Sequence, residues 1–236
     1  MLNITNVSKS YDKKKNAIDK INLEILPGDI YGFIGHNGAG KTTLLKSIAG
    51  ILNFDEGDIT IFGKSIIKDN LDAKRLIAYI PDNPDVYESL TGIQYLDFVA
   101  DAFDVSLEQR RLLINKYAEM FEMSEVLNNQ ISSYSHGMKQ KIVIMSALIH
   151  SPKAMLLDEP FVGLDPKASF LLKDVFRHLV EQGSLIFFST HVLEVAEKLC
   201  NKVAIIKNGR IVANGTTEEI IKDKSLENIF IDLLQE

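Results

Sequence analysis

The sequence predicts an α/β fold in which helices cover both faces of a mostly parallel sheet and a helical insert interrupts the core. In the last third of the chain, short apolar runs typical of buried strands alternate with helical segments. From Leu90 to His150, glycine is almost absent and apolar residues follow helical spacing, as in LEQRRLLINKYAEMF. The buried strands are expected at Ile30–Ile34, Ala154–Leu157, Leu185–Phe188 and Val203–Ile206, and further strands among turns at Leu2–Val7, Ile18–Leu26 and Asp58–Phe62.

Composition restricts the class of protein. The 236 residues suit one domain of elaborate topology, and 46% hydrophobic with 25% charged residues is ordinary for a globular chain. No apolar run approaches the roughly 18–20 residues of a membrane-spanning helix. The first residues lack the basic segment followed by an apolar segment that is typical of a signal peptide. The net charge of −6 without a large basic block argues against nucleic acid as a partner. We therefore expect a cytosolic protein, whose single Cys200 excludes an intrachain disulfide and is a small buried hydrophobe.

A glycine-rich segment directly after the strand Ile30–Ile34 fits the phosphate-loop pattern G-x-x-x-x-G-K-[ST] and opens the helix KTTLLKSIAG. Its glycines let backbone N–H groups face an anion, and the N-terminus of the helix also attracts that anion. Lys41 would supply positive charge for the β- and γ-phosphates of ATP, and the Thr42 hydroxyl would ligate Mg²⁺. This strand-loop-helix context favours a nucleotide site over a simple glycine-rich turn. The expected nucleotide-binding residues here are Gly35, His36, Asn37, Gly38, Ala39, Gly40, Lys41, Thr42 and Thr43.

Two carboxylates, Asp158 and Glu159, follow the strand Ala154–Leu157. Ligands of α/β sheets bind beyond the carboxyl ends of the strands, so both side chains are expected near the phosphates. Asp158 would hold Mg²⁺ through its water shell, and Glu159 would orient or deprotonate the attacking water. A solvated turn is the alternative, but the phosphate loop upstream favours ATP hydrolysis.

Further segments resemble motifs of the ABC transporter ATPase family. Ser135-His136-Gly137-Met138-Lys139-Gln140 resembles the family signature, although His136 stands where a Gly is most common and Tyr134 where a Leu is usual. The resemblance implies that Ser135, Gly137 and Met138 face the γ-phosphate bound by the other subunit of a dimer. The alternative for Ser135 is a simple helix cap.

The resemblance implies roles for three more residues, Asp165, His191 and Tyr11. Gly163-Leu164-Asp165-Pro166 resembles the segment that touches the opposite subunit, with Asp165 as the dimer contact. Phe188-Ser189-Thr190-His191 resembles the switch region, in which His191 contacts the γ-phosphate and acts with Glu159 in catalysis. Tyr11 matches the aromatic residue that stacks on adenine. A structural histidine and a tyrosine packed on the sheet are the respective alternatives.

The resemblance covers nearly the whole chain and implies its organisation. A single ABC ATPase domain, 1–236, would combine a RecA-like core at 1–87 and 152–236 with an inserted helical subdomain at 88–151 that carries the signature. It would also have a small N-terminal antiparallel β part. ATP and Mg²⁺ would be the cofactors. Because one chain has one phosphate loop and one signature, two chains, identical or homologous, would close head to tail around two ATP molecules.

A polytopic membrane permease encoded separately would be the second partner, holding the protein at the inner face of the cell membrane. Val86–Thr91 and the helical insert would receive a coupling helix from it. The local sequences SHGMKQK and PDVYESLTG look more like those of exporter ATPases with separate permeases than like importer ATPases.

Asp82 is a third departure from the family, which commonly has a Gln after the strand containing Tyr79 and Ile80. A carboxylate can ligate Mg²⁺, but it brings negative charge towards the γ-phosphate. We expect Asp82 to approach Mg²⁺ when the dimer closes, with Asn83 as the second candidate. The alternative is a loop residue that never reaches the metal.

Rival functions make different demands on the sequence. A soluble ABC-type ATPase of translation or DNA repair usually carries two such domains or long coiled-coil insertions. A small-molecule kinase would not need the signature or the GLDP segment. A module that binds ATP without hydrolysing it would not need Glu159 or His191. The sequence therefore favours a transport ATPase.

Overall fold

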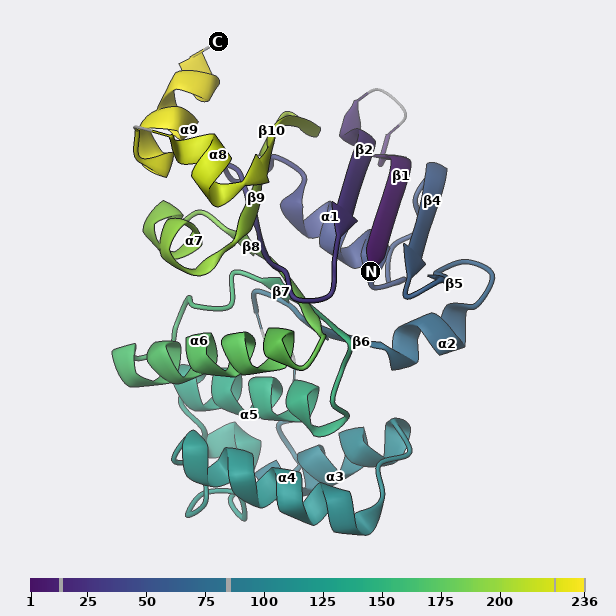
Figure 1. Ribbon diagram of the computed structural model, residues 1–236. Helices are drawn as coiled ribbons and strands as arrows, with labels where there is room; N and C mark the ends of the chain where they lie inside the picture. The colour runs from purple at the N-terminus through teal and green to yellow at the C-terminus, as the bar shows by residue number, and fades with distance from the viewer. Residues whose placement is uncertain (13–14, 84–85, 223, 236) are drawn as a thin grey trace.

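The computed structural model describes residues 1–12, 15–83, 86–222 and 224–235, so the first two residues of PDVYESLTG lie outside it. Two sheets and a set of helices form the structure (Figure 1). The strands are β1 (Leu2–Ser10), β2 (Asn16–Ile25), β3 (Ile30–Ile34), β4 (Glu56–Ile61), β5 (Lys64–Ser65), β6 (Ile77–Ile80), β7 (Ala154–Asp158), β8 (Leu185–Thr190), β9 (Lys202–Lys207) and β10 (Arg210–Thr216). The helices are α1 (Lys41–Ile48), α2 (Asn70–Arg75), α3 (Gly92–Ala102), α4 (Leu107–Met120), α5 (His136–Ile149), α6 (Pro166–Glu181), α7 (Leu193–Leu199), α8 (Thr217–Ile221) and α9 (Leu226–Gln235), with a 3-10 turn η1 (Ile131–Ser133).

The larger sheet is mostly parallel, as the sequence predicts. Its order is β10-β9-β3-β8-β7-β6, and only β10 runs antiparallel to its neighbour. Strands β3, β7 and β8 are buried along their whole length, which explains why they read as continuous apolar runs. Because β3, β8, β7 and β6 are neighbours in this order, their carboxyl ends lie side by side at one edge of the sheet.

The smaller N-terminal sheet is antiparallel, with the order β2-β1-β4-β5, and confirms the expected antiparallel part. Apolar side chains of β1, β2 and β4 form one core with α1 and one face of the larger sheet, where Phe33 and Phe187 pack. Helix α1 thus lies between the two sheets, with its N-terminus at the edge where β3 ends.

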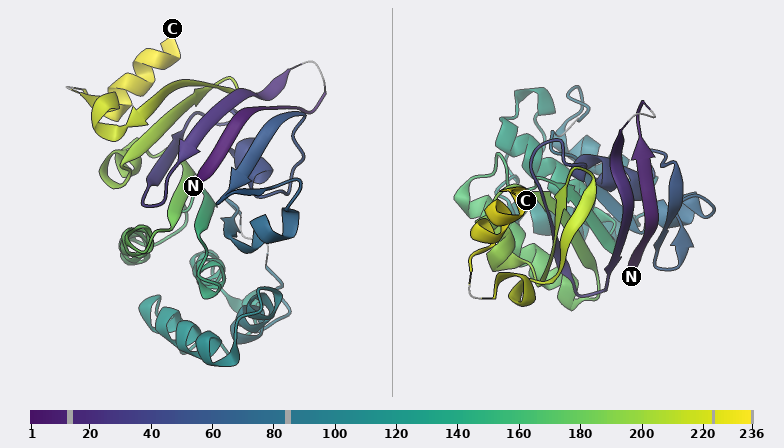
Figure 2. Two further views of the ribbon diagram at one scale, coloured as in Figure 1. Left: turned by 45° about the vertical axis from the view of Figure 1, so that its right-hand side comes forward. Right: turned by 90° about the horizontal axis from the view of Figure 1, so that it is seen from above.

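Among the described residues between β6 and β7, the regular elements are helices, apart from an isolated bridge between Thr91 and Gln130. Helices α3 and α4 pack against α5 and lie beyond it on the side away from the sheets (Figure 2). Arg110 on α4 joins them by ion pairs to Asp97 and Asp101 on α3. The division into a core and an 88–151 subdomain stays a prediction, since one apolar cluster runs through both parts.

Several elements were missed by the sequence reasoning, among them β10, α8 and α9. In β10 exposed and half-buried residues alternate along a sheet edge, so no continuous apolar run marks it. Cys200 is buried as expected, and burial raises the pKa of its thiol. None of the helices in the described ranges has both the length and the apolar character that crossing a membrane requires.

Candidate functional site

A cavity of about 350 Å³ lies at the edge where the parallel strands end. It combines the phosphate loop after β3, the carboxylates Asp158 and Glu159 at the end of β7, and Asp82, which follows β6. The structure therefore brings together side chains that are more than a hundred positions apart in the sequence. The lining residues are Tyr11, Ala17, Asn37, Gly38, Gly40, Lys41, Thr42, Thr43, Asp82, Asp158 and Glu159.

Close packing shapes the phosphate loop. Gly40 has a φ of +112°, and a Cβ added there would lie 2.4 Å from the carbonyl oxygen of Ala17. A Cβ at Gly35 would lie 2.7 Å from the carbonyl oxygen of Ile206 on β9. Larger residues are therefore excluded at both ends of the loop. Gly40 also precedes α1 without a side-chain cap, which leaves the first N–H groups of the helix available for an anion.

Lys41 places a buried ammonium group inside the loop. Its Nζ donates hydrogen bonds to the carbonyl oxygens of Gly35 at 2.6 Å and His36 at 3.3 Å. Burial lowers the pKa of Lys41, while the carboxylates of Glu159, Asp158 and Asp82 oppose this change. The positive charge thus faces three carboxylates across the cavity, as expected where a phosphate and a metal ion would come between them.

The oxygen ligands proposed for Mg²⁺ lie next to one another. The Thr42 hydroxyl donates a 2.6 Å hydrogen bond to Oδ2 of Asp158, and the buried Ser189 hydroxyl donates to Oδ1 of the same carboxylate. Within the described ranges, no cluster of three or more His, Cys, Asp or Glu side chains could hold a metal ion by itself. This arrangement fits Mg²⁺, because that ion is usually held by one or two carboxylates together with water and phosphate oxygens.

Glu159 has a constrained backbone and well-defined partners. Its φ is +50°, a left-handed conformation that non-glycine residues adopt mainly where surrounding contacts enforce it. Here the backbone N–H donates to the hydroxyl of Ser189 at 3.1 Å. Oε1 of its carboxylate lies 2.9 Å from Nδ1 of His191, and Oε2 accepts a hydrogen bond from the His191 backbone N–H at 3.3 Å. His191 therefore lies directly against the carboxylate, with its side chain half-exposed.

Tyr11 and Asp82 lie on the cavity wall. The ring of Tyr11 is 67% exposed, so it does not pack on the sheet, and its hydroxyl is 3.3 Å from the hydroxyl of Thr43. Stacking on adenine stays a prediction. Asp82 lines the cavity in the single chain, before any dimer forms, and its contact with a metal likewise stays a prediction.

The residues of the signature do not line this cavity. Ser135 caps α5, its hydroxyl accepting from the backbone N–H of Met138 at 3.3 Å, and both Ser135 and His136 are exposed. The ring of His136 lies against Gly163, which follows the Glu159 strand end. Tyr134 is buried, and its hydroxyl donates to the carbonyl oxygen of Val126. The tyrosine that replaces the usual Leu therefore makes a hydrogen bond within the helical region.

Asp165 caps α6 in the single chain. Its Oδ1 accepts from the backbone N–H of Ala168 at 2.8 Å, and its Oδ2 lies 3.1 Å from Nζ of Lys141 on α5. The Ala168 hydrogen bond and the Lys141 side chain lower the pKa of this carboxyl. Its contact with a second subunit stays a prediction, as do the roles of Ser135, Gly137 and Met138 towards a second ATP.

Sequence reasoning missed the role of Ser189. Its hydroxyl joins Asp158 to the backbone of Glu159, but a serine at the end of an apolar strand carries no signal of such a bond. Ala17 was also missed. It lines the cavity through its position beside Gly40, which its carbonyl oxygen approaches closely, and its side chain carries no functional group that the sequence could reveal.

Taken together, the fold and the cavity define a nucleotide-binding domain of the phosphate-loop ATPase class. Comparison with known proteins identifies the family: the model of the ABC transporter family matches residues 18–162. The chain belongs to the ABC transporter family, as an ATP-binding domain.

Curated relatives and a solved structure agree with this assignment. The ABC-type transporter ATP-binding protein EcsA of Bacillus subtilis is 32% identical over 241 residues, covering 100% of this chain and 97% of that protein. The Nod factor export ATP-binding protein I of Burkholderia thailandensis is 32% identical over 218 residues, covering 92% and 71%. The chain spans 59% of an uncharacterized ABC transporter ATP-binding protein of Synechocystis, with 31% identity over 212 residues. A solved ATP-binding subunit of an ABC transporter superposes with a TM-score of 0.95 at 31% identity, over 99% of both chains.

Proposed function

We propose that this chain is the Mg²⁺-dependent ATP-hydrolysing subunit of a transporter, and that it powers export through separate membrane-spanning subunits. The observation that carries the hydrolytic part is the arrangement of Thr42, Asp158 and Glu159 at one cavity, with His191 against the Glu159 carboxylate. A bound Mg²⁺ ion would neutralise phosphate charge and orient the γ-phosphate. Thr42, Asp158 and Asp82 are the residues that would hold it.

Glu159 is the candidate for positioning the attacking water. Nδ1 of the His191 ring lies 2.9 Å from Oε1 of Glu159, so that Nε2 of the ring would be available to face the phosphate. The Lys41 ammonium, 3.8 Å from the Glu159 carboxylate, would move its contact from backbone carbonyl oxygens to phosphate oxygens. Hydrolysis in this proposal depends on positioning and charge, as phosphoryl transfer generally does.

The cavity of a single chain supports a dimer because it is open towards solvent and holds no residue of the signature. The N-terminus of α5, with Ser135 at its cap, is an exposed anion-binding end that a second chain would bring to the γ-phosphate. Head-to-tail pairing of two chains would complete two such sites.

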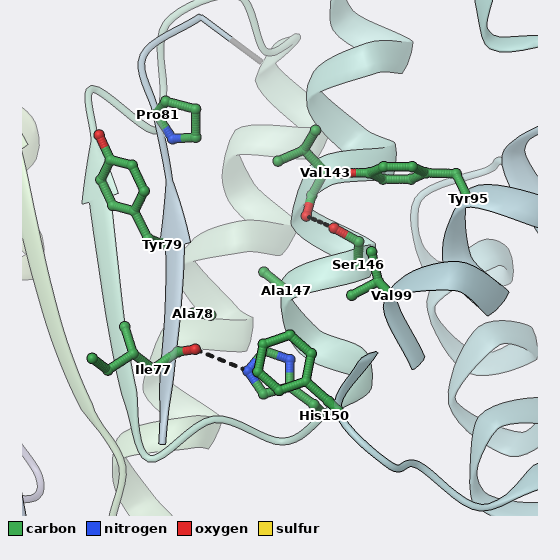
Figure 3. Close-up of a pocket in the computed structure, with 11 residues that line it drawn as sticks. Ile77, Ala78, Tyr79, Pro81, Tyr95, Val99, Val143, Ser146, Ala147 and His150 are labelled. Carbon is green, nitrogen blue, oxygen red and sulfur yellow. Dashed lines mark hydrogen bonds between the residues drawn. The ribbon is translucent and has the colours of Figure 1, made fainter. Parts of the chain in front are cut away.

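A second cavity, of about 250 Å³, is the proposed attachment site for the permease (Figure 3). It lies between β6, α3 and α5, with Pro81, Tyr95, Val99 and Ala147 on its walls. Beside it, Tyr87 and Phe98 form an exposed aromatic pair, with 5.6 Å between the ring centroids and exposures of 60% and 51%. A coupling helix with apolar side chains would cover this surface and place the protein at the inner membrane face.

The export direction is supported by the local sequences around Ser135 and Val86 and by the relative named as a Nod factor export protein. A soluble ATPase of translation or DNA repair is less consistent with relatives that carry transporter names.

The test is Glu159→Gln. The amide oxygen can still accept from His191, so the fold and ATP binding should remain, while hydrolysis should fall by at least about a hundredfold because an amide cannot take a proton. Size-exclusion chromatography should show an ATP-dependent dimer. Glu108→Gln, on the exposed start of α4, is the control and should change neither property. Hydrolysis near that of the wild type would remove Glu159 from catalysis. A monomer with ATP, both alone and with the permease, would contradict the dimer.

A further inference from the structure

Strand β6 contributes an unexplained tyrosine to the nucleotide side of the sheet. Tyr79 lies opposite Leu156 in the parallel register of β6 and β7, and both side chains pack in the core that contains α1. Asp158 is two residues beyond Leu156, so it faces the same side of the sheet. Figure 3 shows the ring of Tyr79 on the side of β6 away from Ala147 and His150, with its hydroxyl at the level of Pro81.

The length of the side chain places its hydroxyl near the carboxylates. Two residues of a strand span about 6.6 Å, which a tyrosine side chain directed along the strand can cover. Burial, followed by the negative charges of Asp158 and Asp82, raises the pKa of Tyr79. The phenol is therefore a neutral hydrogen-bond donor with two carboxylates near it.

This hydroxyl has no hydrogen-bond partner among the described residues, although it is buried. A buried hydroxyl left without a partner destabilises a protein by about 1–3 kcal/mol. Of the two nearby carboxylates, Asp158 already accepts from Thr42 and Ser189, one hydrogen bond on each oxygen. Asp82 is exposed, and no hydrogen bond to its carboxylate occurs in the part of the chain that the structure describes.

We infer that Tyr79 is a positioning residue of the Mg²⁺–ATP site, whose hydroxyl donates to the carboxylate of Asp82 when nucleotide is bound and holds it beside Thr42 and Asp158. The inference rests on the proposed function and adds to it the reason why a carboxylate can serve at position 82. The Asp82 side chain is shorter than that of Gln, so it reaches the metal only if it is held in a fixed position. The hydrogen bond donated by Tyr79 would hold it there and offset part of the negative charge of the carboxylate.

The experiment measures the ATP affinity of the full chain twice for each variant, with Mg²⁺ and with EDTA in its place. Tyr79→Phe removes only the hydroxyl and should weaken binding by about tenfold to a hundredfold with Mg²⁺, the loss of one hydrogen bond to a charged acceptor. Binding in EDTA should stay within about twofold, since the hydroxyl does not act on the phosphates themselves. The melting temperature of the nucleotide-free protein should not fall, because the hydroxyl has no partner there.

Asp82→Ala is the second variant and tests the pair on an exposed residue, where folding is not at risk. It should show the same Mg²⁺-specific loss, and Tyr79→Phe should add nothing to it in the double variant. Tyr117→Phe, a buried tyrosine on α4 far from the cavity, is the matched control and should leave both affinities unchanged.

The inference would be overturned if ATP binding weakened equally with Mg²⁺ and with EDTA, or if the effects of the two variants were fully additive. It would also be overturned if either single variant bound ATP in the presence of Mg²⁺ as tightly as the wild type. A wild-type chain that binds no ATP under either condition would instead overturn the proposed function, so the two failures can be told apart.

Discussion

Ser189→Ala tests the hydrogen bonds that organise the catalytic carboxylates. The Ser189 side chain is fully buried, and its hydroxyl donates to Asp158 while accepting from the backbone N–H of Glu159. The Glu159 N–H keeps a 3.2 Å bond to the Ser189 carbonyl oxygen, so the main loss is the donor to a buried carboxylate. Hydrogen bonds to charged groups contribute about 1.5–3 kcal/mol. For a chain of this size, each kcal/mol lowers the melting temperature by roughly 2–4 °C, which gives a decrease of about 3–12 °C.

Ser146→Ala provides the matched control. This serine is also buried, but its hydroxyl donates to the carbonyl oxygen of Val143 in the preceding turn of α5, without a charged partner. Alanine favours the helix, so the loss of a neutral hydrogen bond is partly offset and the melting temperature should change by less than about 2 °C.

The assay is thermal unfolding of both variants with and without Mg²⁺–ATP. Ser189→Ala should also reduce the stabilisation by Mg²⁺–ATP, because Asp158 keeps only Thr42 to orient it, whereas Ser146→Ala should leave that stabilisation intact. If the two variants lose equal stability and respond equally to Mg²⁺–ATP, the Ser189 hydrogen bond does not organise the site.

Two further predictions concern the phosphates. Lys41→Ala should abolish ATP binding at millimolar Mg²⁺–ATP, because the cavity would keep three carboxylates without their counter-charge; an affinity within about threefold of the wild type would contradict this role. Ser135→Arg should leave ATP binding by the single chain intact and block turnover, because the larger side chain would fill the position of the second subunit's γ-phosphate; normal hydrolysis by this variant would show that Ser135 only caps α5.

The sequence was sufficient to predict elements whose residues repeat a simple physical pattern. Strand β7 is buried on both faces and therefore consists of consecutive apolar residues, and the phosphate loop is confined by contacts that only glycine allows at Gly35 and Gly40. Strand β10 was missed because an edge strand needs no apolar run, and its sequence RIVANGT mixes polar and apolar residues.

The supporting residues of the site could not be predicted for a different reason. Ser189 bonds to Asp158 and Glu159 at the end of a neighbouring strand, and Tyr79 lies beside the strand that carries Asp158; both placements follow from the strand order, which no local pattern contains. His191 could be assigned a role only through the resemblance to a family; in the structure its ring lies 2.9 Å from the Glu159 carboxylate, to which its backbone N–H donates.

Strand β6 and the segment after it connect the two cavities of the proposed transporter subunit. Residues of a strand alternate between its faces, so Tyr79 faces the nucleotide side while Ala78 faces the cavity proposed for the permease. The segment Val86–Thr91 begins four residues after Asp82 and is bound to the stretch that leads into the signature. Backbone hydrogen bonds join Ser132 to Glu88 and Ile131 to Leu90, and the Glu88 side chain pairs with Lys139 on α5.

A coupling helix that moves this segment would therefore act on both ends of the ATP site. On one side lies Asp82, which would face the ATP of its own chain, and on the other lies Ser135, which would face the ATP of the second chain. Since only Tyr134 separates η1 from Ser135, which caps α5, displacement of the segment by a permease would change the orientation of the α5 N-terminus. The short path through residues 88 and 132 is thus a physical reason why transport and dimer closure would be coupled in this chain.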